Sequence, residues 1–153
     1  MSNSAMVTYT KLSPNCNKPR NHAIDTITIH HMAGNCTVET CGEIFAPTSR
    51  QASSNYGVDN KGHVGLYVEE ANRSWCSSNR DNDHRAITIE VANDGGAPDW
   101  HVSDTALNTL IKLVADICKR NGIKKLIWSN NKSDRVNLSV MFSARIFILK
   151  NLL

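Results

Sequence analysis

Two segments of the sequence each combine alternating β-branched residues with one side chain that can do chemistry. The first, Thr26–His31, carries His30, and the second, Ala86–Val91, carries Glu90. Strand side chains alternate between faces, so His30 and Glu90 each share a face with threonines and the isoleucines share the other. If the strands are neighbours, the imidazole and the carboxylate approach each other. An imidazole that binds a metal, beside a carboxylate that moves a proton, is the arrangement of metal-assisted amide hydrolysis.

The elements that position these two side chains are predicted to form an α/β fold. The predicted strands cover residues 23–31, 54–59, 63–68, 86–92 and 125–128, with a turn at 60–62 joining the second and third. One short helix is predicted to be capped by Thr37 and stopped by Pro47. A longer amphipathic helix is predicted between its cap, Ser103, and its stop, Gly122. We therefore expect a single domain with a mixed central sheet of about five strands flanked by helices.

The composition excludes several classes of protein. The chain has 153 residues, 41% hydrophobic and 20% charged, which is ordinary for one globular domain. Its net charge of +3 is scattered and no glycine-rich phosphate loop is present, so we expect no nucleic-acid partner. No run reaches the ~18 apolar residues of a membrane span, and the polar N-terminus carries no signal peptide, so we expect cytoplasmic synthesis. Five cysteines without a CxxC motif predict free thiols.

Several ordered motifs resemble one known family. They are Ile27–Gly34, Ser53–Val58, Gly62, Val68–Glu70, Arg73–Trp75 and Arg85–Asn93. Together they look like the zinc N-acetylmuramoyl-L-alanine amidases of type 2, which are related to peptidoglycan recognition proteins and include the catalytic domains of many phage endolysins. The similarity runs from about residue 24 to residue 133. The resemblance implies the amidase and peptidoglycan recognition protein-like version of the α/β fold.

The resemblance also implies an activity and a site. The family hydrolyses the amide between N-acetylmuramic acid and the L-alanine of the stem peptide in bacterial peptidoglycan, with Zn²⁺ as cofactor. The family's histidine at the end of the first strand corresponds to His30, a zinc ligand. Its carboxylate on the strand before the long helix corresponds to Glu90, the catalytic general base. The residues expected near the substrate groove are Asn55, Trp75, Arg85 and Asn93.

The C-terminal part of the sequence departs from this family. Relatives carry a second zinc histidine and a third ligand, Cys or Asp, after the strand corresponding to residues 125–128. Here no histidine follows His101 and no cysteine follows Cys118. Because a catalytic zinc normally has three protein ligands, we expect His30 alone to retain zinc weakly. His31, His63, His84 or a cysteine would have to complete the site, and nothing in their spacing selects among them.

The expected organisation is an irregular leader at residues 1–22, an amidase-like catalytic domain at 23–137 and an atypical apolar tail at 138–153. As a wall-lytic enzyme of the endolysin or autolysin type, the protein is expected to act on the cell wall after release. The alternative function is a non-catalytic peptidoglycan-binding protein or a degenerate amidase fragment. The apolar tail leaves two oligomeric states open, a monomer or a dimer formed through the tail.

Overall fold

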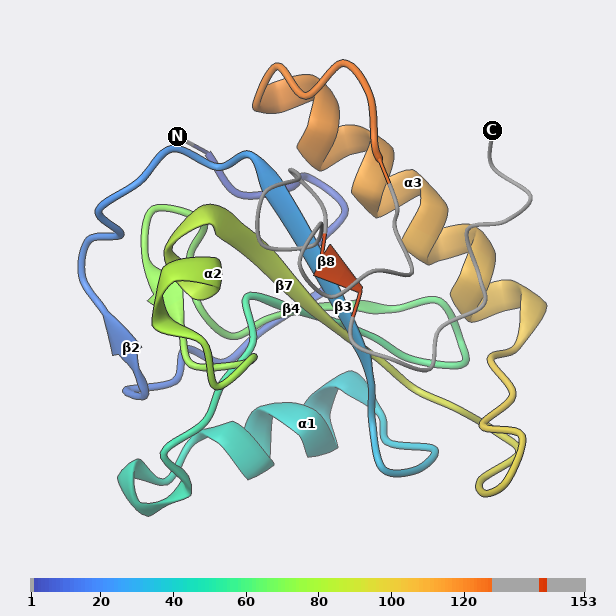
Figure 1. Cartoon of the computed structure of the whole chain (residues 1–153). Helices are drawn as coiled ribbons and strands as arrows, with labels where there is room; N and C mark the ends of the chain where they lie inside the picture. Colours follow the sequence, from blue (N-terminus) through green and yellow to red (C-terminus); the bar gives the residue numbers. More distant parts are fainter. Residues whose placement is uncertain (1, 128–140, 143–153) are drawn as a thin grey trace.

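The structure, a computed structural model, describes residues 2–127 and 141–142 (Figure 1). Its centre is a mixed six-stranded sheet in the order β1-β5-β4-β7-β3-β8. In that order the strands are Tyr9–Thr10, Val64–Leu66, Tyr56–Val58, Ala86–Val91, Thr26–His31 and Met141–Phe142. Within this sheet β4 and β5 form the predicted antiparallel hairpin, and the other neighbours run parallel. A smaller sheet pairs β2 (Cys16–Asn17) with β6 (Arg73–Ser74).

The described residues also form three α-helices and one short 3-10 helix. These are α1 (Val38–Phe45), η1 (Thr48–Arg50), α2 (Arg80–Arg85) and α3 (Asp104–Arg120). The hydroxyls of Thr37 and Ser103 accept hydrogen bonds from the first turns of α1 and α3, which confirms both predicted caps. Asn79 caps α2 in the same way. None of the described helices combines the length and apolar character needed to cross a lipid bilayer.

The two faces of the sheet are covered differently. Helix α3 packs on one face, and α1 and α2 lie on the other side of the sheet (Figure 1). The α3 face holds the main core, which includes Ile27, Ile29, Ile87, Ile89, Leu110, Leu113 and Ile117. On the opposite face Thr28 and Thr88 are also fully buried, but against polar side chains of α2 and the β6 region. The predicted alternation of the two strands is therefore confirmed, with both faces buried as in central parallel strands.

The C-terminal part of the predicted sheet is different in the structure. Residues 125–127 form no strand, and Trp128 lies outside the described residues. The sheet has a further short strand, β8, whose Met141 and Phe142 pair with Thr28 and Ile29 of β3. The rest of the apolar tail lies outside the described residues, and with it the choice between a monomer and a dimer formed through the tail.

The N-terminal segment packs onto the domain. Residues 1–22, predicted to be irregular, supply the short strands β1 and β2. Arg20 is 7% exposed and its guanidinium donates hydrogen bonds to a ring of backbone carbonyls. Those carbonyls belong to Glu70 at 2.7 Å, Asn72 at 2.9 Å, His84 at 2.8 Å, Ala86 at 3.1 Å and Asp83 at 3.4 Å. A single side chain thus joins the N-terminal segment to the β6 region and to the start of β7.

Candidate functional site

The register of β3 and β7 brings the two predicted chemical side chains together. The strands are parallel, and His30 lies directly opposite Glu90. The His30 Nδ1 and Glu90 Oε1 atoms are 3.7 Å apart, with the side chains 22% and 16% exposed. On the other side of Glu90 the neighbour on β4 is Gly57, and the Tyr67 ring occupies the space that a side chain at this position would need. The predicted approach of imidazole and carboxylate on the threonine face is therefore confirmed.

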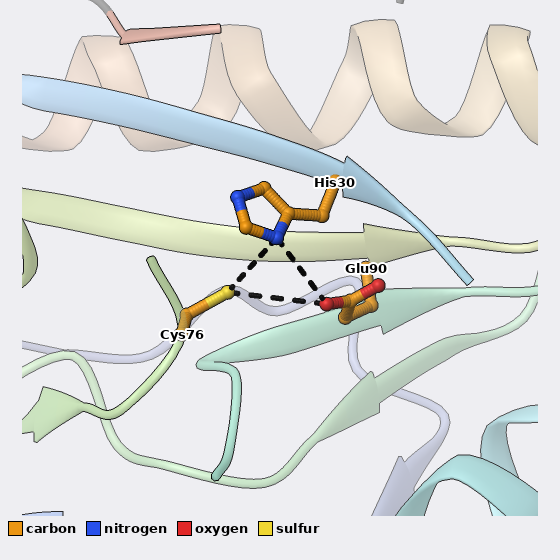
Figure 2. Close-up of side chains that lie close together, drawn as sticks. All are labelled: His30, Cys76 and Glu90. Atoms are coloured by element: carbon orange, nitrogen blue, oxygen red, sulfur yellow. Dashed lines mark hydrogen bonds and ion pairs between the residues drawn. The ribbon is translucent and has the colours of Figure 1, made fainter. Parts of the chain in front are cut away.

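Cys76 forms a third corner that the sequence did not single out. Its Sγ lies 3.7 Å from His30 Nδ1 and 3.9 Å from Glu90 Oε1 (Figure 2). Cys76 comes from the segment between β6 and α2, which has no periodic pattern and no characteristic spacing to either residue. Within the part of the chain that the structure describes, these three form the group of His, Cys, Asp or Glu side chains that could hold a metal ion, with ligand atoms within 4.8 Å of one another.

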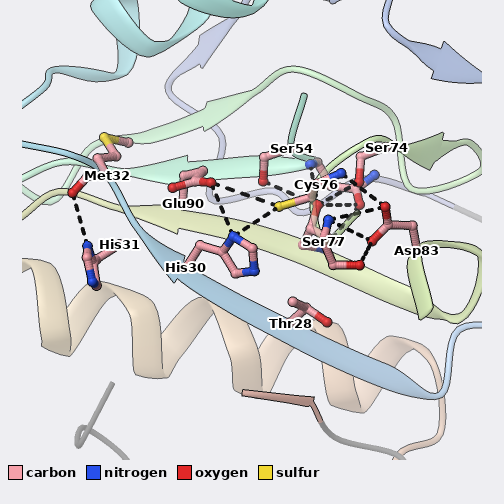
Figure 3. Close-up of polar contacts among 12 residues, drawn as sticks. Thr28, His30, His31, Met32, Ser54, Ser74, Cys76, Ser77, Asp83 and Glu90 are labelled. Atoms are coloured by element: carbon pink, nitrogen blue, oxygen red, sulfur yellow. Dashed lines mark hydrogen bonds and ion pairs between the residues drawn. The ribbon is translucent and has the colours of Figure 1, made fainter. Parts of the chain in front are cut away.

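Cys76 is held in position by Asp83, a buried residue of α2. The Asp83 carboxylate accepts hydrogen bonds from the backbone N–H groups of Cys76 at 3.0 Å and Ser77 at 3.2 Å. It also accepts one from the Ser77 hydroxyl at 2.6 Å (Figure 3). On the preceding side, Trp75 N–H donates to the Ser53 hydroxyl at 3.0 Å. The backbone on both sides of the Cys76 thiol is thus held by hydrogen bonds to Asp83 and Ser53.

Burial sets the charge of all three groups. Loss of hydration raises the pKa of the Glu90 carboxyl to about 7, against smaller opposing effects of the Cys76 thiol and Arg50. Burial likewise lowers the pKa of His30, so its imidazole is neutral near pH 7. It raises the pKa of the Cys76 thiol well above its usual range, with the negative charges of Glu90 and Asp83 acting in the same direction. In the absence of a cation this site therefore favours uncharged groups.

The raised pKa of Glu90 predicts a pH-dependent stability of the metal-free protein. Below about pH 4.5 the carboxyl is neutral in both the folded and unfolded states and costs nothing. Above about pH 7 it is charged in both, and the folded state bears the cost of burying that charge. At pH 8 we therefore expect metal-free Glu90→Gln to be more stable than wild type by about 2 to 3 kcal/mol.

That difference should disappear as the pH falls from 7 to 4, and urea unfolding at several pH values in the presence of a chelator measures it. Glu69→Gln at an exposed position is the matched control and should show no such pH-dependent gain. A gain that is equal at pH 4 and pH 8 would contradict a charge effect.

The three donor atoms fit the chemistry of zinc. Zinc in proteins is bound by imidazole nitrogen, thiolate sulfur and carboxylate oxygen, and this site offers one of each. The neutral imidazole is in the form that binds a metal, and a cation would favour the ionised thiol and carboxyl that burial opposes. A divalent cation would thus relieve the electrostatic cost of this cluster.

Two of the predicted substrate residues are buried. Asn55 is 0% exposed, and its amide donates to the carbonyls of Val68 and other backbone groups and accepts from Thr88 N–H at 3.1 Å. Asn93 is 1% exposed and donates to the Met32 carbonyl at 2.5 Å. Both side chains fasten loops to strand ends, so neither has surface with which to contact a substrate.

Trp75 and Arg85, the other two predicted substrate residues, differ in their position relative to His30 and Glu90. Trp75 is half-buried and lines a hollow of about 330 Å³ together with Cys76 and Arg80. Arg85 precedes the first residue of β7 and pairs with Asp25 at 2.7 Å. Glu90 is four residues beyond Ala86 along this strand, or roughly 13 Å away. Trp75 therefore borders the site, and Arg85 does not.

The remaining histidines considered as ligands are engaged elsewhere. His31 points away from His30 (Figure 3). Its ring stacks on Trp100, with ring centroids 4.9 Å apart. His63 contacts the Asp59 carboxylate at 3.0 Å, and the His84 ring accepts a hydrogen bond from Asn21 N–H at 3.1 Å. All five cysteines belong to the described residues and are free thiols, as predicted.

Comparison with known proteins identifies the family. No curated protein sequence matches the chain significantly. Among solved structures, the endolysin amidase LysCS from Clostridium intestinale URNW is similar with a TM-score of 0.57 and 21% identity, covering 78% of this chain and 76% of LysCS. The Drosophila peptidoglycan recognition protein SA gives a TM-score of 0.57 and 15% identity over 90% of this chain and 95% of that protein.

A further similar structure is peptidoglycan recognition protein LE in complex with tracheal cytotoxin, a monomeric diaminopimelic acid-type peptidoglycan. Its TM-score is 0.54 and its identity 14%, over 75% of this chain and 78% of that protein. These similarities establish the amidase and peptidoglycan recognition protein-like fold. The sequence profile of the N-acetylmuramoyl-L-alanine amidases matches residues 20–135, which include β3, β7 and the Cys76 segment. This chain belongs to the N-acetylmuramoyl-L-alanine amidase family.

Proposed function

We propose that this protein is a zinc-dependent peptidoglycan hydrolase that cleaves the amide between N-acetylmuramic acid and the L-alanine of the stem peptide. The observation that carries the proposal is the pairing of His30 with Glu90 at the same ends of two parallel strands, within the residues that match the amidase family. As an enzyme of the endolysin type, it would act on the cell wall of a bacterium after release from the cytoplasm.

The side chains of the site have separate tasks in this reaction. His30 holds the zinc ion, which when bound polarises the scissile carbonyl and lowers the pKa of water. Glu90 takes a proton from the attacking water and delivers it to the leaving amine of L-alanine. A carboxyl with a pKa of about 7 suits both transfers, since it exchanges protons readily near neutral pH. Trp75 at the rim offers an aromatic face to sugar or peptide.

The proposal is tested with purified protein, zinc and isolated bacterial cell walls. We expect new α-amino groups of L-alanine to appear with time, and His30→Ala to lower this rate at least about 100-fold because the imidazole ligand is lost. His22→Ala, an exposed histidine, is the matched control and should keep the wild-type rate. Zinc-loaded wild-type protein that releases no stem peptide from walls of several chemotypes would disprove the enzymatic function.

A second candidate function is peptidoglycan binding without turnover. The observation in its favour is that no histidine follows His101, where relatives carry their second zinc histidine. Sedimentation of the protein with insoluble cell walls, without release of α-amino groups, would support binding alone. Such a result separates the two candidates because both predict sedimentation and only the first predicts release.

A further inference from the structure

The structure offers a different way to complete a metal site than ligands from the C-terminal part of the chain. The donor atoms of His30, Cys76 and Glu90 form a nearly equilateral triangle with edges of 3.7, 3.7 and 3.9 Å. A point equally distant from its corners lies about 2.2 Å from each atom, within the bond lengths that zinc makes to N, S and O ligands. A hydrogen bond needs only two of these atoms to approach each other, whereas here all three donor atoms surround one point.

The thiol corner is built as firmly as the strand corners. Asp83 binds both backbone N–H groups that flank the Cys76 side chain, and Asn79 caps the helix that carries Asp83. A ligand held by such hydrogen bonds needs little reordering when a metal binds. The His30 and Glu90 side chains are 22% and 16% exposed, so a position at the site remains open toward solvent for water or substrate.

We propose that Cys76 is a metal ligand, and that its Sγ, His30 Nδ1 and Glu90 Oε1 form a three-donor zinc centre that uses no residue after Glu90. The choice of zinc rests on the proposed function. On binding, the thiol loses its proton to solvent and a sulfur–metal bond replaces the S–H bond. The other carboxylate oxygen of Glu90 points away from Cys76 and His30 and stays available for proton transfer (Figure 2).

Metal content and cobalt spectra test this proposal independently of hydrolysis. After chelator treatment, reloading and dialysis, wild type is expected to hold about one zinc per chain by elemental mass spectrometry. Cys76→Ser should bind zinc at least about 10-fold more weakly, whereas Cys118→Ser, another half-buried thiol, should match wild type. Substituting Co²⁺ should give a thiolate-to-metal absorption band in wild type and Cys118→Ser, and none in Cys76→Ser.

Thiol alkylation of the wild-type protein tests the same ligand without any substitution, so it holds even where a variant folds poorly. With zinc, alkylation of Cys76 should slow at least about 10-fold relative to the chelator-treated sample, while Cys36 and Cys118 react as before. Equal rates at Cys76, or unchanged zinc binding in Cys76→Ser, overturn the proposal. Failure to bind zinc at all in wild type also overturns it.

The two proposals fail separately. If zinc binds through Cys76 but no stem peptide is released, the proposed amidase function is contradicted and the proposed metal centre is supported. If Cys76→Ser keeps full amidase activity and full zinc content, the proposed role of Cys76 is contradicted and the proposed amidase function is supported.

Discussion

Glu90→Gln is expected to lower the release of stem peptide from cell walls by about 100-fold to 10,000-fold, the range typical of losing a general acid–base. Glutamine has the size of glutamate but cannot take a proton from water at neutral pH. Its carbonyl oxygen still faces His30 and Cys76, so the comparison is made at saturating zinc with metal content measured in the same samples. The rate at saturating wall concentration is the quantity to compare.

The fold should survive this substitution. Glu90 lies between His30 and Gly57 on the sheet. Its side chain contacts His30 and Cys76 and is not part of the hydrophobic core. Circular dichroism and an unfolding midpoint no lower than that of wild type therefore serve as controls, and Glu69→Gln is the matched variant at an exposed site. Turnover by Glu90→Gln equal to that of wild type would mean that another group is the base.

Arg20→Ala is expected to have the largest effect on stability, a loss of about 3 to 5 kcal/mol. The substitution removes a buried guanidinium and leaves the carbonyls of Glu70, Asn72, His84 and Ala86 without this donor. For a chain of this size, such a loss lowers the thermal midpoint by roughly 10 °C or more. Chemical and thermal unfolding of wild type and variant provide the measurement.

Two further variants make the Arg20 experiment specific. Arg20→Lys keeps the charge but cannot reach every carbonyl with one ammonium group, so it should fall between wild type and Arg20→Ala. Arg80→Ala removes an exposed arginine from α2 and should change stability by less than about 0.5 kcal/mol. If Arg20→Ala resembles Arg80→Ala, the carbonyl ring finds other donors and Arg20 is not needed to hold it.

The central part of the fold and the closeness of His30 to Glu90 were predictable from the sequence. Alternating isoleucines and threonines define which face each side chain takes, and this periodicity survives in the structure because both strands lie in the middle of the sheet. The helix caps Thr37 and Ser103 were also predictable, because a hydroxyl residue just before an amphipathic helical segment typically accepts a hydrogen bond from the first turn. Local chemistry and periodicity were sufficient for these features.

Other parts of the site depend on contacts that no local pattern records. Cys76 reaches His30 only because Asp83, on a following helix, binds the backbone around it. Asn55 and Asn93 have side chains suited to contacting a substrate, yet in the fold these amides bind backbone carbonyls. The same chemical groups serve both purposes, so only the three-dimensional structure separates them.

Strand register also determines which sequence changes this site tolerates. A one-residue deletion at the start of β3 would turn its following side chains to the opposite face, so that His31 would replace His30 and Ile29 would replace Thr28. The segment after Ser74 that carries Cys76 has no such register to keep. Over many generations, changes in length in that segment can therefore supply or remove a donor while the sheet remains intact.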